Sequence, residues 1–183
     1  MYMQNYICPL VYYDYYRNNE RYDNDLQTVK EAIANIKGGV LAPNISGTVI
    51  FTDVGNGTEV FVEVNGLPEY SPASQNKPQI GPFGFHIHQN GNCSVGDEKE
   101  PFPDTGEHWN PTNQPHGNHA GDFPVLFSNN GYAKMIFFTN KFTVGQIIGK
   151  SVIIHESPDD YRTQPSGNSG RKLACGVIER MYM

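Results

Sequence analysis

The fold is decided by residues 46–64, which read SGTVIFTDVGNGTEVFVEV. The first half is rich in β-branched and aromatic residues, and Gly55-Asn56-Gly57 supplies a turn. In the second half, Glu59 and Glu63 fall on one face and the valines on the other. This period of two is typical of a half-buried strand. The stretch therefore predicts a β-hairpin.

Four further segments have the composition of short strands, namely residues 83–88, 132–138, 151–155 and 173–178. Two long loops separate them, at residues 68–82 and 89–122. Residues 24–39 are ambiguous, because they could form a capped helix, whereas the alternation at residues 32–36 also suits a strand. Short strands with two long loops indicate an all-β sandwich or barrel.

Composition and charge narrow the class of protein. A chain of 183 residues fits one domain with a sizeable core, and a net charge of −6 argues against a general nucleic-acid binder. No stretch is apolar enough to span a bilayer. The N-terminus lacks the pattern of a signal peptide, so we expect a cytoplasmic location. The three cysteines, Cys8, Cys93 and Cys175, allow one disulfide and one unpaired thiol.

Residues 1–27 differ from the rest of the chain. They carry seven of the eleven tyrosines, interspersed with Asn, Asp, Arg and Glu. We expect a poorly ordered, polar N-terminal extension. The alternative is a segment for self-association or surface attachment, since tyrosines offer large amphipathic contacts. Residues 28–183 then form the domain.

The chemistry-bearing residues are histidines. The loop from His108 to Asp122 holds three of the six histidines and ends on an aspartate. Three imidazoles and one carboxylate are a complete shell for zinc, although a polar surface loop is the alternative. His86 and His88 are two apart on a predicted strand, so both side chains point to one face, about 7 Å apart. Such a pair can bind one metal, or can simply be exposed.

His155 ends the apolar strand 151–155, so all six histidines lie in three places. Two metal sites would use all six if one histidine served both. Imidazole-only sites suit copper as well as zinc. A nitrogen-only site with an open position suits redox copper, whereas three histidines and an aspartate suit a closed zinc site.

Four motifs follow one another along the chain: GPFGFHIH (81–88), GEHWNP (106–111), SVIIHE (151–156) and GNSGRKLACGVI (167–178). In this order they resemble those of the copper/zinc superoxide dismutase family. Residues 81–88 (GPFGFHIH) are similar to its copper-ligand strand, and residues 106–111 (GEHWNP) to the start of its zinc loop. Residues 151–156 (SVIIHE) and 167–178 (GNSGRKLACGVI) resemble its last two signatures. The resemblance implies an eight-stranded Greek-key β-barrel or sandwich with long metal-binding and electrostatic loops. It also makes Lys30–Gly38 the first strand.

The resemblance further implies a role for each histidine. It implies copper ligands at His86, His88, His108 and His155, and zinc ligands at His108, His116, His119 and Asp122. In this reading His108 bridges the two metals. Asp159 matches an outer carboxylate that links a copper histidine to a zinc histidine. Cys93 and Cys175 match the family's disulfide.

Three features depart from the family pattern. Lys172 stands where the family has a substrate-guiding arginine, and Arg171 lies one place earlier; with His108, we predict these as the catalytic residues. Lysine keeps the charge but loses the planar fork. Two residues separate His116 from His119, which shortens the zinc loop. The segment between His155 and Lys172 is also short, and Arg162 is a candidate for the charged rim of the substrate channel.

The function implied by the resemblance is antioxidant: an oxidoreductase that converts superoxide to dioxygen and hydrogen peroxide with copper and zinc as cofactors. The first alternative is a non-enzymatic zinc- or copper-binding protein of the same fold. Others are a cupin-type metalloenzyme built around His86 and His88, and a copper-storage or surface protein that uses the tyrosine-rich extension. We expect no nucleic-acid or membrane partner, and either a monomer or a homodimer.

Overall fold

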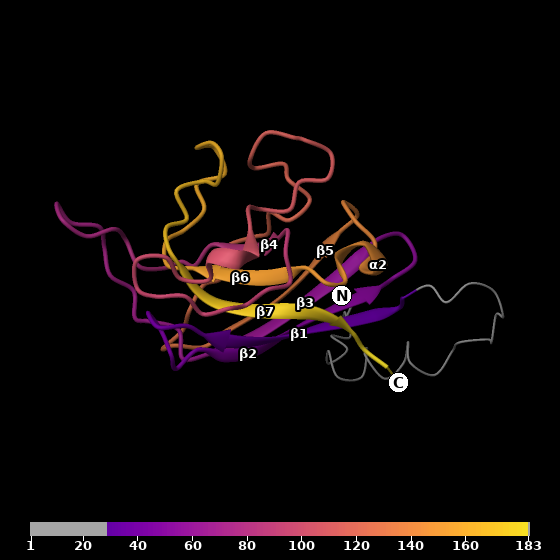
Figure 1. Cartoon of the computed structure of the whole chain (residues 1–183), viewed down its shortest axis with the longest axis horizontal. Helices are drawn as coiled ribbons and strands as arrows, with labels where there is room; N and C mark the ends of the chain where they lie inside the picture. Colours follow the sequence, from indigo (N-terminus) through magenta and orange to yellow (C-terminus); the bar gives the residue numbers. More distant parts are fainter. Residues whose placement is uncertain (1–28, 183) are drawn as a thin grey trace, which may run out of the picture.

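The structure is a computed structural model and describes residues 29–182, which form one antiparallel sheet with long loops (Figure 1). The strands within these residues are β1 (Glu31–Gly38), β2 (Ser46–Asp53), β3 (Thr58–Asn65), β4 (Phe85–His88), β5 (Ala133–Thr139), β6 (Ser151–His155) and β7 (Lys172–Arg180). The helical elements are η1 (Pro103–Thr105) and α2 (Val144–Ile147). The all-β prediction is confirmed. The predicted extension, residues 1–27, lies outside the described residues.

The predicted hairpin is formed by β2 and β3. Val49 pairs with Val62, and Phe51 pairs with Val60. All four side chains are fully buried, as the alternation in the sequence requires. The turn closes through a hydrogen bond from the backbone of Val54 to that of Gly57. One face of the hairpin therefore builds the core, and the other faces outward.

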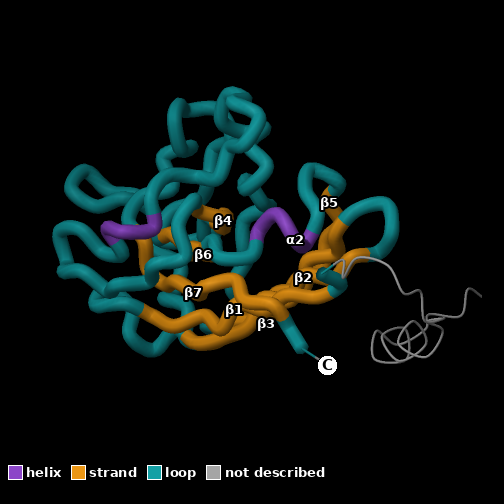
Figure 2. Tube along the Cα trace, turned by 45° about the vertical axis from the view of Figure 1, so that its right-hand side comes forward, coloured by secondary structure: helices purple, strands orange, loops and turns teal. Residues whose placement is uncertain are grey.

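The strands lie in the order β4-β6-β7-β1-β2-β3-β5. Because β7 returns to lie beside β1, the set β7-β1-β2-β3 has the order of a Greek key. β1 pairs with strands on both of its edges, which satisfies its backbone and settles the ambiguous segment as a strand. Figure 2 shows the sheet in orange, with the longest loops gathered near β4 and β6. Neither helical element of the described residues is long and apolar enough to cross a membrane.

The described residues contain seven regular strands, whereas the resemblance implies eight. Residues 121–126 run along the side of β4 that does not pair with β6, where an eighth strand would lie. The backbone of Ile87 donates to Gly121 over 2.9 Å, and that of Phe123 donates to Phe85 over 3.2 Å. Pro124 has no N–H to donate, so the pairing cannot continue as a regular ladder. The segment therefore covers the edge of β4 without becoming a strand.

A disulfide between Cys93 and Cys175 ties the loop after β4 to β7, with the Cα atoms 5.7 Å apart. The two cysteines pack with Phe102 and Ile153 in a small cluster of their own. The bond joins residues 82 positions apart, so it constrains much of the unfolded chain.

Cys93→Ser should lower the free energy of unfolding by about 2–5 kcal/mol, the usual cost of losing a native disulfide. Chemical denaturation followed by circular dichroism measures this. The wild-type protein under reducing conditions is the control and should unfold at the same denaturant concentration as the variant. Equal stability of the variant and the oxidised wild type would contradict the prediction.

Candidate metal centre

The side chains of β4 alternate between the core and the face of the sheet that the long loops cover. Phe85 and Ile87 are fully buried in the core cluster. His86 and His88 alternate with them, as predicted, and are also buried. His108 reaches the same side because its loop pairs with β4, where a β-bridge joins it to His88. The loop is thus held in register with the strand that carries the first two histidines.

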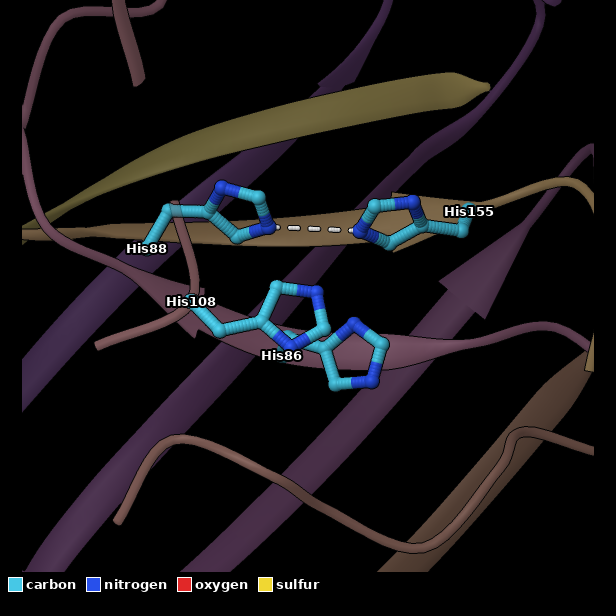
Figure 3. Close-up of side chains that lie close together, drawn as sticks. All are labelled: His86, His88, His108 and His155. Atoms are coloured by element: carbon cyan, nitrogen blue, oxygen red, sulfur yellow. Dashed lines mark hydrogen bonds between the residues drawn. The ribbon is translucent and has the colours of Figure 1, made fainter. Parts of the chain in front are cut away.

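A first group consists of His86, His88, His108 and His155, whose nearest nitrogens all lie within 4.8 Å of one another. All four side chains are buried. His155 joins the group from the end of β6, where a bulge interrupts the pairing with β7. Figure 3 shows His88 and His155 facing each other and the ring of His108 close to that of His86.

The hydrogen bonds of His88 and His155 determine which nitrogens are available. Nδ1 of His88 lies 2.8 Å from the carbonyl of Gly106, and Nδ1 of His155 lies 3.1 Å from that of Gly170. A carbonyl only accepts, so each Nδ1 donates. In neutral rings the two Nε2 atoms then hold lone pairs, yet they lie 3.2 Å apart. Two facing lone pairs repel each other unless a cation lies near both.

A second group consists of His108, His116, His119 and Asp122. Nδ1 of His108 lies 3.1 Å from Oδ1 of Asp122, and Nδ1 of His116 lies 3.3 Å from Oδ2. Nδ1 of His119 lies 3.4 Å from Oδ1. The two-residue spacing between His116 and His119 therefore still brings both rings to the carboxylate. His108 is the residue that the two groups share.

Four buried nitrogens of these groups have no hydrogen-bond partner. They are Nε2 of His108 and Nδ1 of His86, His116 and His119. Buried polar atoms are nearly always paired, and leaving one unpaired costs about 1–3 kcal/mol. A metal ion would satisfy these atoms, because each can offer a lone pair. The donor sets, four imidazoles in one group and three with a carboxylate in the other, fit copper and zinc respectively.

The carboxylate of Asp159 links one histidine of the first group to one histidine of the second. Its Oδ2 accepts from Nε2 of His86, and its Oδ1 accepts from Nε2 of His116, each over 2.8 Å. Both donors are thereby fixed as protonated at Nε2, which leaves Nδ1 to face the group. Gly167 lies against this carboxylate with φ of 67°, where a Cβ would collide with Asp159 and His116. A larger residue at 167 would therefore displace the linking carboxylate.

Burial and neighbouring residues shift the pKa values of several members of the two groups. Burial lowers the pKa of His155 to about 3, with the neighbouring His108 adding to the effect. Burial, followed by the nearby histidines, also lowers the pKa values of His86 and His88 well below their usual range. Burial raises the pKa of Asp122, but the hydrogen bond from His108 and the surrounding histidines outweigh it and hold the pKa below its usual range. Neutral imidazoles and an ionised carboxylate are the forms that bind metals.

The two predicted cationic residues differ in their surroundings. The ammonium of Lys172 donates to the carbonyl of Phe102 over 3.1 Å and to Oγ1 of Thr105 over 2.8 Å. Lys172 pairs with His155 across β6 and β7, so its charge lies beside the first group. Arg171 instead binds Glu156, with Nη2 and Oε2 2.9 Å apart. The lysine is the better placed of the two to attract an anion.

Sequence reasoning missed Tyr161, which connects the loops around the second group. Its hydroxyl donates to the carbonyl of Phe123 over 3.0 Å and accepts from the backbone of Val125 over 2.9 Å. Its own backbone N–H donates to Oδ1 of Asp159 over 2.7 Å. Tyr161 thus links the chain after Asp122 to the carboxylate that holds both groups. No local pattern identifies it, because the partners of its hydroxyl are more than thirty residues away.

Tyr161→Phe should weaken zinc binding by about tenfold, as the loss of supporting contacts around metal ligands typically does. The ring is kept, so packing is preserved and only the two hydroxyl hydrogen bonds are lost. Competition with a chelator of known affinity measures the change. Tyr70→Phe, at an exposed tyrosine on another loop, is the matched control and should bind zinc as the wild type does. An unchanged zinc affinity of Tyr161→Phe would show that the link is dispensable.

Comparison with known proteins agrees with this geometry. The sequence profile of the family described as copper/zinc superoxide dismutase (SODC) matches residues 45–178. A superoxide dismutase [Cu-Zn] of Deinococcus radiodurans is 34% identical over 152 residues, which cover 74% of this chain and 78% of that protein. Superoxide dismutase [Cu-Zn] 2 of Aquifex aeolicus is 29% identical over 173 residues, covering 86% of this chain and 89% of the relative.

The similarity extends to an animal protein. The extracellular superoxide dismutase [Cu-Zn] of Mus musculus is 31% identical over 147 residues, covering 74% of this chain and 54% of that protein. The profile match contains β2 to β6 and nearly all of β7, and with them every residue of the two groups. The chain belongs to the copper/zinc superoxide dismutase family.

Proposed function

We propose that this chain converts two superoxide ions and two protons to dioxygen and hydrogen peroxide. His86, His88, His108 and His155 would hold copper, and His108, His116, His119 and Asp122 would hold zinc. The copper supplies a one-electron redox couple when bound, and the zinc supplies a fixed positive charge. The remaining chemistry belongs to the residues of the chain.

The observation that carries this proposal is the position of His108. One nitrogen of its ring faces Asp122 in the second group, and the other, Nε2, lies unpaired in the first group. A ring placed between the two groups in this way would offer Nε2 either to copper or to a proton. Nε2 is then able to hold a proton and to pass it to the reduced oxygen species. The protein thereby keeps a proton at the place where superoxide is reduced.

Asp159 positions two histidines and Lys172 attracts the anion, but neither side chain takes part in the reaction itself. Asp159 fixes the tautomers of His86 and His116, so that their lone pairs point into the groups. The positive charge of Lys172 lies beside His155, where it would attract a small anion despite the net charge of −6. Burial lowers the pKa of this lysine, while Glu107 and Glu100 oppose the change.

The alternative is a metal-binding protein of the same fold without enzymatic activity. A chain with that function would be expected to lack a ligand of the redox site. Here all four imidazoles of the first group are present and buried together. This completeness favours the enzyme.

Stopped-flow measurement of superoxide decay tests the proposal. The protein is stripped with a chelator and reloaded with zinc alone, copper alone, or both metals. We expect catalytic decay only when copper is present, and the most stable activity when zinc is present too. The metal-free and zinc-only forms are the controls for metal dependence. Bound copper without catalytic turnover would overturn the enzyme and leave the metal-binding alternative.

A further inference from the structure

The outer face of the sheet carries a continuous row of apolar side chains. Ile33 on β1 pairs with Ile50 on β2, which pairs with Phe61 on β3, which in turn pairs with Ile136 on β5. Phe138 lies two residues farther along β5 and points to the same face. We call these five side chains the outer row.

The outer row is separate from the core. Its members alternate with the less exposed residues of their strands, and none of the five belongs to the core cluster or packs against it. Ile136 is 47% exposed and Phe138 is 52% exposed, whereas the other three members are partly buried. The ammonium of Lys134 lies 5.3 Å from the centre of the Phe61 ring. A contiguous exposed apolar surface on a soluble protein usually marks an interaction site. The metal centre does not use this face.

β5 is also an open edge of the sheet. It is the last strand in the order, and within residues 29–182 no strand pairs with its outer side. The opposite edge, β4, is covered by residues 121–126. An open edge strand with exposed apolar residues readily associates with another segment, which proteins normally prevent by covering it. The outer row therefore lies beside the one edge of the described sheet that is left open.

The chain itself supplies a segment at this place. Residues 1–27 join the sheet just before Glu31, and the line of pairing from Glu31 runs through Thr52 and Glu59 to Phe138. Neighbouring strands lie about 4.8 Å apart, so this line is roughly 14 Å long. About five extended residues span that distance. A segment of this length reaches every member of the outer row.

We propose that residues 1–27 dock on the outer row of the same chain. The segment contains seven tyrosines, whose rings cover apolar surface while their hydroxyls stay with water or an acceptor. Because the segment is tethered beside the row, docking is intramolecular, with an effective concentration on the order of millimolar. Weak individual contacts are sufficient under that condition.

Glutamates beside the outer row can accept hydrogen bonds from tyrosine hydroxyls. Tyr132 already shows the arrangement, because its hydroxyl donates to Oε1 of Glu63 over 2.8 Å. Glu59 pairs with Phe138 in the register, and its carboxylate has no hydrogen bond or ion pair to other residues in the described part of the chain. A tyrosine of the segment can donate to Glu59 while its ring covers Phe138. The surface thus matches tyrosine in both its apolar and its polar parts.

Cross-linking from Cys8 tests the docking. The chain has three cysteines, and the other two form the disulfide, so a benzophenone maleimide attaches selectively at Cys8. The full-length, metal-loaded protein is labelled and irradiated, and the cross-linked peptides are identified by mass spectrometry. We expect cross-links to the peptides that contain Phe61 and Ile136–Phe138. A mixture with isotope-labelled chains separates links within a chain from links between chains.

Matched variants identify the surface. Joint replacement of Ile136 and Phe138 by serine should lower the cross-link yield by about tenfold, because it removes apolar surface whose burial drives docking. Phe127→Ser removes a side chain that is 69% exposed elsewhere and should leave the yield unchanged. Metal content reports whether each variant is folded. If the double variant does not fold, the positions of the cross-links in the wild-type protein decide the test. The proposal would be overturned by cross-links spread over the whole surface, or by an unchanged yield in the folded double variant. Cross-links found only between chains would also overturn it and would point to docking on a second copy.

Discussion

His108→Ala should lower the rate of superoxide dismutation by more than about a hundredfold, since losing even a supporting residue of a metal site costs 10–100-fold. His108 is shared by the two groups, so its loss removes a ligand from each. The first group keeps three histidines and should still bind copper, with lower affinity. The variant also lacks Nε2, the atom that we propose holds the proton, so each copper ion that remains bound should support a slower reaction.

The rate per bound copper separates these two effects. We expect it to fall together with any spectral signature of coupling between the two metals. Thr112→Ala, at an exposed residue of the same loop, is the control and should keep wild-type activity. Wild-type activity per copper in His108→Ala would show that the shared ring has no role in the reaction.

Asp159→Asn should lower the affinity for zinc and copper by about 10–100-fold, the usual cost of losing a carboxylate that orients metal ligands. The carboxylate accepts from both His86 and His116. An asparagine in its place has one acceptor oxygen and a donating NH₂ group, so it can accept from only one of the two rings. The other ring is then free to turn or to change tautomer.

Competition with chelators of known affinity measures the binding of each metal by the Asp159→Asn variant. Asp160→Asn is the control, because this neighbour is exposed and its carboxylate binds Arg162, Thr163 and Asn168 but no histidine. The control removes the same charge but should bind both metals as the wild type does. If the two variants lost affinity equally, the effect would come from charge alone, and the linking role of Asp159 would be wrong.

The strands were predictable wherever alternation and β-branched residues coincide. The hairpin of β2 and β3 and the strand β6 lie at, or within one residue of, their expected bounds. Local pattern could not assign β1, because both helix and strand fit its sequence; its pairing with β2 and β7 decides. Residues 121–126 gave no strand signal, since Pro124 prevents a regular ladder. Their position depends on β4, which is distant in the sequence.

The site was predictable to the extent that residue type and period determine it. A period of two places His86 and His88 on one face, and the resemblance supplies the remaining predicted ligands. The carbonyls of Gly106 and Gly170, which fix the tautomers of His88 and His155, have no signature in the sequence. Any glycine can offer a carbonyl, so only the fold identifies these two.

The short zinc loop, predicted as one of three departures from the family, closes by tight turns. The backbone of Asn118 donates to Pro115 over 3.1 Å, and the backbone of His119 donates to Oδ2 of Asp122 over 3.0 Å. These bonds bring His116 and His119 to one carboxylate without a longer insert. The ligand roles, the oligomeric state and the cytoplasmic location stay predictions.

Diffraction recorded at the copper and zinc absorption edges, from crystals of the metal-loaded protein, tests the central claim most directly. The claim is that two metal sites share His108. It predicts a copper peak next to the unpaired nitrogens of the first group, a zinc peak next to Asp122, and the ring of His108 between them. A single peak, or two peaks with His108 bound to only one of them in the oxidised protein, would contradict it.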